Sequence, residues 1–485
     1  MKIFIILPTQ LYENINHLKD DKYDQIYLVE ENINFVYLKY TKLKLAYHRA
    51  TMKNYFDYLK KNDIDVKYLE YDYKKNFKND EIFMLNPADH LIVERWKKLT
   101  KQYTILPNLT FLISEKEILE KKNTKYTHDT FYKYMRKKLD ILMTDDNRPE
   151  GERWSFDKEN RKKMNSNVKV PQLTDTYDNK YIKEAIKYVN KNFKDNYGQL
   201  DNFIYPIDHS QSKTWLNDFI KRRFSKFGDY QDFVSKEENH DFLFHSVLTP
   251  MLNVGLLTDK QILDATNRAN VSLNNKEGFI RQLIGWRQYI YTIYMNEGQE
   301  MREMNFFKAK LKIPEKIWKA STMIKPIDDI INKLYKHGYA HHIERLMWLG
   351  AFFLLLGVHP KEVNDWFMVM FIDAYDVFMI PNIFGMTQHA DKGKMMTRPY
   401  FSSSNYLLKM SNYKKNDSKI DLGKNTYTWT EIWDALYYNF ISKHETYLKK
   451  NYSTSRQVYH WNNKSKDEQK NLKSIASKYI KFLFD

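Results

Sequence analysis

Short apolar runs alternate with helical patterns in the first part of the chain. The runs that predict strands are Lys2–Leu7, Ile26–Val29, Val66–Leu69, Ile82–Leu85 and Phe111–Ile113. Between two of them, residues 42–60 carry apolar and aromatic side chains near the 3.6-residue spacing of a helix. Strands that alternate with helices predict a doubly wound parallel sheet, so the fold class of this region is α/β.

The remainder of the chain has a different pattern. Residues 131–205 are polar and are interrupted by Pro149, Gly151 and Pro171, which is typical of a long, irregular connector. From residue 206 onward the periodicity is almost entirely helical. We therefore predict an α/β domain over 1–130, an interdomain linker over 131–205 and a large all-α domain over 206–485.

Composition excludes several classes of protein. The 485 residues include no cysteine, which rules out disulfides, thiolate zinc sites, a catalytic thiol and a cysteine-held iron–sulfur cluster. The N-terminus lacks the features of a secretory signal, and the longest apolar stretches, Leu349–Val358 and Trp366–Ile372, are shorter than the ~20 residues of a membrane span. These features predict a soluble, cytoplasmic protein.

The net charge of +17 leaves two interpretations open. Clustered Lys and Arg gain affinity for nucleic acid by releasing phosphate counterions. The abundance of Lys, Asn, Ile and Tyr is also what AT-rich codons supply, in which case the charge marks only a solvated surface. Charge alone does not decide between them, because it bears on partners and solubility and not on fold.

The densest group of candidate residues begins at His341. His341 and Arg345 stand four residues apart on one helical face, with His342 about 100° away. Neither histidine has a carboxylate four residues on, which disfavours a metal site and leaves a buried structural histidine or a general acid. Asp373 lies between apolar runs, where an ionised carboxylate needs a cation, and Arg345 is the candidate.

Three further segments combine residue types that suit a cofactor or nucleic acid. Basic, aromatic and hydroxyl residues alternate between Thr397 and Tyr406, which fits phosphate and stacked-base contacts, although turns favour several of the same residues. Hydroxyls precede Pro250 at a predicted helix start, as phosphate contacts or as ordinary caps. A helix over Glu277–Tyr289 places Trp286, by default, in the core.

Five motifs occur together in one order and spacing. They are Phe244–Asn253 (FHSVLTPMLN), Glu277–Ile290 (EGFIRQLIGWRQYI), Tyr339–Met347 (YAHHIERLM), Asp373–Asn382 (DAYDVFMIPN) and Thr397–Tyr413 (TRPYFSSSNYLLKMSNY). With them the chain resembles the photolyase/cryptochrome superfamily, and most closely its branch of prokaryotic (6-4) photolyases and iron–sulfur bacterial cryptochromes. The resemblance covers essentially the whole chain.

The resemblance implies a helical domain that holds FAD, an N-terminal antenna domain, and a monomeric deoxyribodipyrimidine photolyase that repairs UV-damaged DNA in blue light. The positions that correspond to FAD contacts are Ser246, Leu248, Thr249, Gln282, Trp286, Arg345, Asp373, Tyr375, Met379 and Asn382. His342, with His341 beside it, matches the histidine that protonates a (6-4) lesion, and Arg398, Tyr400 and Tyr406 would contact the flipped lesion.

The predicted activity is reversal of (6-4) pyrimidine photoproducts, because that reaction needs a general acid and splitting a cyclobutane dimer does not. Two alternatives stay open, namely a cyclobutane pyrimidine dimer photolyase and a cryptochrome-like blue-light sensor without repair. A basic DNA-binding scaffold without flavin is a third.

The sequence departs from the family at three places. Pro326, Lys414, Asp417 and Thr430 stand where the branch has cluster-binding cysteines, so we predict no iron–sulfur cluster. Trp366 and Trp318 match the electron relay to the flavin, but Phe367 replaces a common tyrosine, which predicts slower or rerouted photoreduction. A ribityl-lumazine antenna would use Gln10, Glu30, Tyr47 and His48, yet the usual G-D-Q-L motif is PTQL here, so an empty site also stays open.

Overall fold

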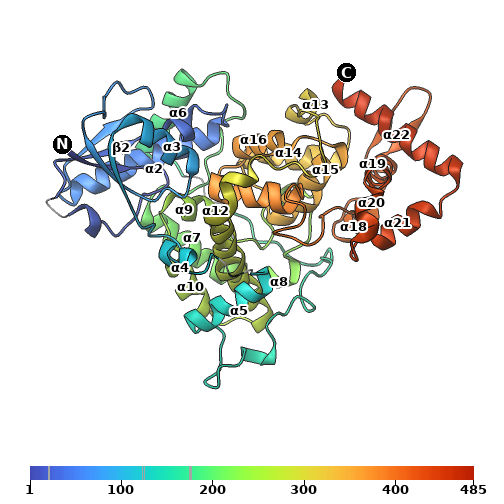
Figure 1. Ribbon diagram of the computed structural model, residues 1–485, viewed down its shortest axis with the longest axis horizontal. Coiled ribbons are helices and arrows are strands. Elements are labelled where there is room, and N and C mark those ends of the chain that lie inside the picture. The colour runs from blue at the N-terminus through green and yellow to red at the C-terminus, as the bar shows by residue number, and fades with distance from the viewer. Residues whose placement is uncertain (20–21, 123, 125, 174–176) are drawn as a thin grey trace.

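A five-stranded parallel sheet forms the centre of the N-terminal region of the computed structural model, which describes residues 1–19, 22–122, 124, 126–173 and 177–485 (Figure 1). The strands are β1 (Lys2–Ile6), β2 (Gln25–Val29), β3 (Val66–Leu69), β4 (Glu81–Leu85) and β5 (Gln102–Leu106). Their order is β3-β2-β1-β4-β5, and Ile5 in the central strand is paired with Tyr27 of β2 and Met84 of β4. The predicted α/β class of this region is confirmed.

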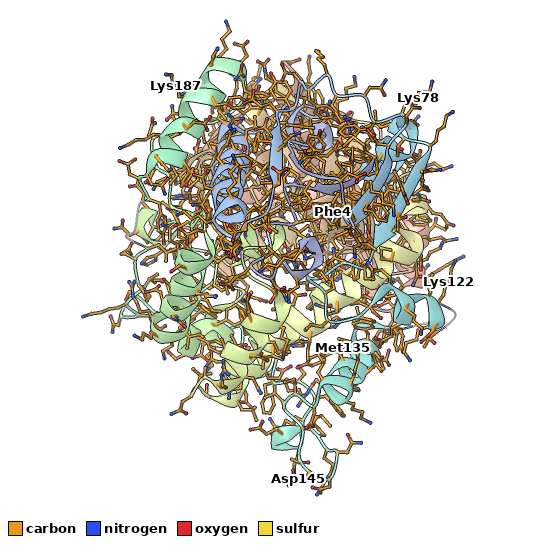
Figure 2. All side chains as sticks on the ribbon, turned by 90° about the vertical axis from the view of Figure 1, so that its left-hand side faces the viewer. Phe4, Lys78, Lys122, Met135, Asp145 and Lys187 are labelled. Carbon is orange, nitrogen blue, oxygen red and sulfur yellow. The ribbon has the colours of Figure 1, made fainter. Side chains whose placement is uncertain are left out.

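Both faces of the sheet are buried, as expected for parallel strands. Phe4 and Ile6 of β1 belong to the main core together with residues of α2 (Lys42–Lys61), whereas Ile3 and Ile5 pack with those of α3 (His90–Leu99). Figure 2 shows Phe4 enclosed, while lysines such as Lys78, Lys122 and Lys187 extend outward at the periphery. The alternation of side chains along β1 therefore assigns one helix layer to each face.

One of the five predicted strands is wrong. Phe111–Ile113 is a loop, and the Phe111 ring stacks on Tyr291 with centroids 3.6 Å apart. These apolar residues therefore serve a contact with a helix. The fifth strand is β5 at the edge of the sheet, where its first three residues are exposed and largely polar, so its sequence carries no buried-strand pattern. The other four strands and the helix over 42–60 are confirmed.

The segment predicted as an irregular connector contains a regular helix, α6 (Lys180–Asn192). Ile182, Ala185 and Val189 form its buried face, and the helix packs on α2. The prediction of irregular structure is therefore wrong for these thirteen residues and for residues 131–139, which belong to the helix α5 (His128–Leu139). The long stretches on either side of α6, including Gly151, are mostly irregular, as predicted.

The C-terminal region is almost entirely helical, which confirms the predicted fold class (Figure 1). The remaining α-helices are α1 (Asn32–Phe35), α4 (Glu115–Glu120), α7 (His209–Arg222), α8 (Phe224–Tyr230), α9 (Thr249–Val254), α10 (Asp259–Arg268), α11 (Leu273–Ile280), α12 (Gln288–Met301), α13 (Glu315–Trp318), α14 (Lys325–His337), α15 (Ala351–Leu356), α16 (Pro360–Met370), α17 (Asp376–Ile380), α18 (Ser404–Lys409), α19 (Trp429–Lys443), α20 (Glu445–Lys450), α21 (Ser455–Asn462) and α22 (Lys466–Phe484). The smaller elements are the 3₁₀-helices η1 (Asn16–Leu18), η2 (Glu150–Glu152) and η3 (Glu238–His240) and the antiparallel strands β6 (Lys419–Asp421) and β7 (Thr426–Thr428).

Three π-helical segments interrupt the helices of this region, namely η4 (Arg281–Arg287), η5 (Glu344–Gly350) and η6 (Pro381–Thr387). The last two approach closely at Gly350, where an added Cβ atom would lie 2.8 Å from the Thr387 side chain. Glycine at this position therefore allows η5 and η6 to pack together. In the part of the chain that the structure describes, no helix is both long and apolar enough to cross a membrane.

Candidate active site: a cavity lined by three π-helical segments

A cavity of about 660 Å³ lies within the helical region. Each π-helical segment contributes to its lining, with Gln282 and Trp286 from η4, Arg345 from η5, and Met386 and Thr387 from η6. π-Helical turns are rare and are often found at functional sites. The volume falls within the range of about 300–1,000 Å³ that is typical of cofactor and ligand pockets.

A buried ion pair borders this cavity. Arg345 donates two parallel hydrogen bonds of 2.9 Å to the carboxylate of Asp373, which confirms the predicted pairing. The Thr249 hydroxyl donates to the same carboxylate, and Asn253 Nδ2 donates to the Asp373 carbonyl at 2.8 Å. Burial opposes the charge on Arg345, but Asp373 outweighs that effect and holds the Arg345 pKa above its ordinary value. Arg345 therefore stays charged.

The two adjacent histidines occupy different environments. His342 lines the cavity and is accessible from it. Desolvation, helped by nearby Arg345, lowers its pKa to about 4, so its ring is neutral at pH 7. His341 is buried behind the wall, where it stacks on His245 with ring centroids 4.3 Å apart. Of these two adjacent histidines, His342 is the one that lines the cavity.

The predicted lesion-contact residues lie together on the cavity wall. Arg398, Tyr400 and Tyr406 all line it. The Arg398 guanidinium lies 5.2 Å from the centroid of the Tyr400 ring, so a cationic and an aromatic surface face the same space. Burial raises the pKa of Tyr406 to about 12, so its hydroxyl is protonated and able to donate at neutral pH.

Most of the predicted FAD contacts also line the cavity. They are Ser246, Leu248, Thr249, Gln282, Trp286, Arg345, Asp373, Met379 and Asn382. Asn382 donates to the Phe378 carbonyl at 2.8 Å. Tyr375 is not among the lining residues, because its ring packs against α2, with its hydroxyl 3.3 Å from His48 Nε2. The structure thus places Tyr375 between the two halves of the molecule.

Several lining or supporting residues had no signal in the sequence. Arg161 and Asp232 face each other at 3.3 Å, and burial raises the Asp232 pKa to about 6. One residue comes from the connector and the other follows α8, so no local pattern links them. His128 stacks on Trp286 with ring centroids 3.7 Å apart and thereby fixes the orientation of a cavity wall.

A row of aromatic rings leads away from the cavity. Phe367 lines it, Trp366 follows at 5.5 Å between ring centroids, and Trp318 lies 6.2 Å farther on. The row ends on Tyr197, which stacks on Trp318 at 4.7 Å and was not predicted. Because the rings are nearly in contact, the two predicted relay residues form one continuous path, although phenylalanine occupies its inner end.

The four candidate antenna residues take part in separate contacts, and no hydrogen bond joins them to one another within the described residues. Gln10 Nε2 donates to the Leu85 carbonyl at 2.9 Å, and Glu30 pairs with Arg49 at 2.7 Å. Tyr47 is buried against Tyr205, and His48 contacts Tyr375. A shared role in chromophore binding stays a prediction.

Two of the four positions that we matched to cluster cysteines, Lys414 and Asp417, are held by ordinary hydrogen bonds and an ion pair. Lys414 N donates to Asp417 Oδ2 at 2.7 Å, Trp429 Nε1 donates to the Lys414 carbonyl at 2.8 Å, and Lys236 pairs with Asp417 at 3.2 Å. No thiolate is present, so these residues do not fit an iron–sulfur cluster. Hydrogen bonds and an ion pair connect the segments around Lys236, Lys414 and Trp429.

Comparison with known proteins identifies the family. The chain is 31% identical, over 511 aligned positions and 99% of both sequences, to the (6-4) photolyase of Agrobacterium fabrum. Residues 4–205 match a family model described as deoxyribodipyrimidine photo-lyase-related protein. The chain therefore belongs to the photolyase/cryptochrome superfamily. Within it, the chain is related over its full length to a (6-4) photolyase, as the five sequence motifs had indicated.

Solved structures agree on the fold. A bacterial class III photolyase from Agrobacterium tumefaciens aligns over 79% of both chains with a TM-score of 0.53 and 15% identity. A cryptochrome from Synechocystis aligns over 97% of this chain and 93% of its own, with a TM-score of 0.54 and 12% identity. At these identities the likeness concerns the fold alone.

Proposed function

We propose that this protein is a light-dependent DNA repair enzyme that binds FAD in the cavity and reverses (6-4) pyrimidine photoproducts in UV-damaged DNA. The observation that carries the proposal is that one cavity holds the buried Arg345–Asp373 pair together with His342 and Tyr400. The full-length relationship to a (6-4) photolyase supports it. The alternative lesion is a cyclobutane pyrimidine dimer, for which a proton donor at residue 342 is unnecessary.

The lining fits a polar cofactor. His245 and Gln231 line the cavity, and one buried polar atom of each, His245 Nε2 and Gln231 Oε1, has no hydrogen-bond partner in the described part of the chain. Arg345, Asp373 and Asn382 would hold the ring system of FAD, and Ser246 would reach its phosphates. Bound FAD supplies light absorption and electron transfer to the lesion, which the side chains themselves lack. A ribityl-lumazine antenna stays a prediction.

His342 is proposed as the proton donor. An imidazole with a pKa of about 4 is almost entirely unprotonated at neutral pH and is therefore a poor general acid. The approach of negatively charged DNA phosphates favours the charged ring and raises that pKa. Binding of the substrate would therefore protonate His342, and His342 would then donate this proton to the lesion. The expected signature is a repair rate that falls as pH rises through the raised pKa.

Arg398 and Tyr406 would fix the substrate by complementary means. The cation suits a phosphate of the damaged strand, and the ring suits a stacked base. A lesion extruded from the duplex could then lie beside His342. We propose that the protein acts on DNA inside the cell as a monomer.

The decisive experiment illuminates reduced, flavin-loaded protein with two oligonucleotides, each carrying one defined lesion. We expect conversion of the (6-4) photoproduct alone. Conversion of only the cyclobutane dimer would overturn the lesion assignment, and conversion of neither would support a light sensor. His342→Ala is expected to abolish (6-4) repair with FAD retained, whereas His460→Ala, on the exposed face of α21, is expected to leave repair unchanged.

Electron supply is tested separately. We propose that Trp366 and Trp318 carry electrons toward the cavity, because their rings continue the row that begins at Phe367. Trp366→Phe is expected to slow photoreduction of the bound flavin, measured as bleaching of its absorbance under blue light with a reductant. Equal rates in the variant and the wild type would remove Trp366 from the path.

A further inference from the structure

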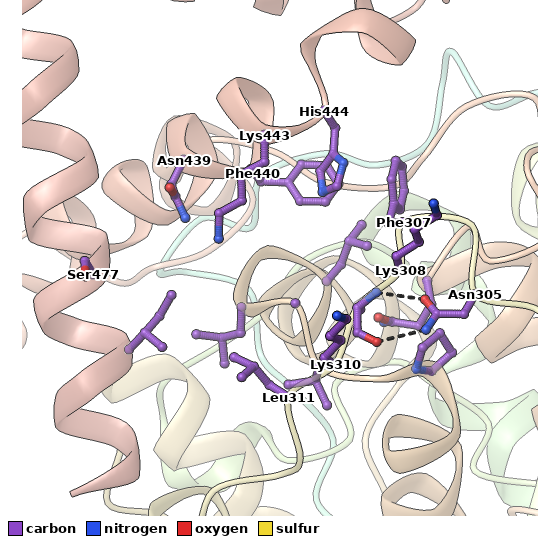
Figure 3. Close-up of a pocket in the computed structure, with 18 residues that line it drawn as sticks. Asn305, Phe307, Lys308, Lys310, Leu311, Asn439, Phe440, Lys443, His444 and Ser477 are labelled. Atoms are coloured by element: carbon purple, nitrogen blue, oxygen red, sulfur yellow. Dashed lines mark hydrogen bonds between the residues drawn. The ribbon is translucent and has the colours of Figure 1, made fainter.

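A second cavity, of about 590 Å³, lies between α19 and the segment over residues 305–311 (Figure 3). Leu354 of α15 and Ile480 of α22 complete its apolar floor. Thr387 lines the first cavity and the next residue, Gln388, lines the second, so consecutive residues belong to the two walls. The proposed repair function makes no use of this second cavity.

The rim of the second cavity is positively charged. Lys308, Lys310 and Lys443 line it with exposed side chains, and none of them forms an ion pair within the described residues. Its 18 lining residues include no Asp or Glu. Three lysines without a carboxylate partner at one cavity favour an anion, and a phosphate group accepts several hydrogen bonds from ammonium groups.

Asn439 provides a second, independent indication of a ligand. Its side chain is 8% exposed and points from α19 into the cavity, as Figure 3 shows. Its amide makes no hydrogen bond to any of the described residues. Because no described residue pairs with it, the amide is able to donate to and accept from a polar ligand in the cavity.

The walls supply three aromatic rings, with Phe307 set edge-on to Phe440 and tilted against His444. The rings of Phe307 and Phe440 lie 5.1 Å apart, and His444 lies 4.5 Å from Phe307. Burial lowers the His444 pKa to about 4, so this ring is uncharged at neutral pH. Asn305 exchanges two hydrogen bonds of 2.8 and 2.9 Å with Ala309, which closes the loop that carries Phe307 and Lys308. The aromatic wall is therefore preformed.

We propose that the second cavity binds a nucleotide, with its phosphates at the three lysines, its heterocycle against Phe307 and Phe440, and a polar edge of the heterocycle hydrogen-bonded to Asn439. Each part of such a ligand has a counterpart in the lining. The volume is within the range of about 300–1,000 Å³ found for small-molecule sites.

Calorimetric titration of the full-length, flavin-loaded protein tests the proposal with three probes, namely ATP, adenosine and tripolyphosphate. We expect ATP to bind at one saturable site and the two fragments to bind at least about tenfold more weakly, because each makes only part of the contacts. Lys310→Glu/Lys443→Glu is expected to weaken ATP binding by about tenfold or more. Lys466→Glu/Lys470→Glu, which removes the same charge from exposed positions on α22, should have little effect.

Asn439→Leu adds a test that leaves the net charge unchanged, and it is expected to weaken ATP binding while tripolyphosphate binding persists. The proposal is overturned if ATP shows no saturable binding, if both double variants lose it equally, or if tripolyphosphate binds as tightly as ATP. Because the lysines are exposed, their replacement should not disturb folding. Flavin content and light-driven repair are measured on the same samples, so failure here is distinguishable from failure of the proposed function.

Discussion

Two buried arginine–carboxylate centres, one in each half of the molecule, have opposite surroundings. In the α/β half Arg49 pairs with Glu30 at 2.7 Å, and in the helical half Arg345 pairs with Asp373 at 2.9 Å. Both withdraw charges from water, which is costly unless each charge is paired and hydrogen-bonded. What surrounds each pair decides whether a ligand is able to reach it.

The Arg49 centre is closed. Glu30 also accepts hydrogen bonds from the hydroxyls of Tyr68 at 2.7 Å and Tyr188 at 3.0 Å. Arg49 reaches a second carboxylate, Glu184, at 2.6 Å, and its guanidinium lies 3.7 Å from the Tyr188 ring. Glu184 and Tyr188 belong to α6, so the centre fastens this helix to α2. The Arg49 centre therefore stabilises the packing of α6 on α2.

The Arg345 centre is open, because it borders the cavity that also holds His342. The comparison teaches that a buried ion pair alone does not indicate a site. A pair whose polar atoms are all used by the chain stabilises the fold, whereas a pair beside empty volume is available to bind and orient a ligand.

The largest effect is expected from breaking the closed centre. Arg49→Met leaves Glu30 buried without its cation, which should lower the free energy of unfolding by about 3–5 kcal/mol. Urea unfolding at pH 7 measures this, and flavin content should stay unchanged. Arg148→Met, at an exposed arginine, is the control. A decrease in the free energy of unfolding below about 1 kcal/mol, which is typical of a surface ion pair, would show that Arg49 does not stabilise the fold.

Breaking the open centre should affect the ligand more than the fold. Arg345→Met removes a charged hydrogen-bonding group at the cavity wall, a loss of about 1.5–3 kcal/mol that corresponds to roughly 10- to 150-fold in FAD affinity. The ratio of flavin to protein absorbance after gel filtration measures it. Arg398→Met should retain flavin and weaken DNA binding. If Arg345→Met also retained flavin, the pair would be structural in both halves.

Lys44 connects the two centres and gives a pH test. It lies on α2 with Arg49, but its ammonium donates to the carbonyls of Met368 at 2.9 Å and Ala374 at 2.6 Å in the helical half. Desolvation lowers its pKa to about 7, with Asp373 opposing the shift. Between pH 7 and 10.5 the unfolded chain therefore holds a proton that the folded chain lacks, so stability rises with pH.

Lys44→Met should remove this contribution, which reaches about 1.4 kcal/mol per pH unit. Urea unfolding between pH 7 and 9 is expected to show a smaller rise in stability for the variant than for the wild type. Lys60→Met, at the exposed end of the same helix, is expected to behave as the wild type does. Parallel curves for the wild type and Lys44→Met would mean that Lys44 keeps its proton in the folded protein.

The sequence predicts what local patterns encode and misses what distant partners decide. Four strands and the helix over 42–60 follow from runs and periodicity. The Arg345–Asp373 pair was predictable because an aspartate between apolar runs demands a cation. Arg161 and Asp232 were not, since both lie in polar segments where a charge needs no partner, and only the fold brings them together.

Glu30, one of the candidate antenna residues, shows the same limit. Glu30 follows a buried strand, where a functional carboxylate and a structural one look alike in sequence. The partners that saturate it lie on β3 and α6, and α6 falls in the segment predicted as irregular. The apolar residues of α6 recur at helical spacing, but they are few and stand among polar residues. Without that helix, nothing in the sequence indicates that the centre is closed.

The most local test of the comparison is a matched pair of single hydrogen bonds, one in each centre. Tyr68→Phe removes a donor to Glu30, and Thr249→Val removes a donor to Asp373. In the closed centre nothing replaces the lost donor, so the free energy of unfolding should fall by about 1.5–3 kcal/mol. In the open centre water from the cavity is able to replace the hydroxyl, so the loss should stay below about 1 kcal/mol.

Urea unfolding of both variants without flavin measures the difference. Equal losses would mean that water does not reach Asp373. The Arg345 centre would then be as closed to water as the Arg49 centre.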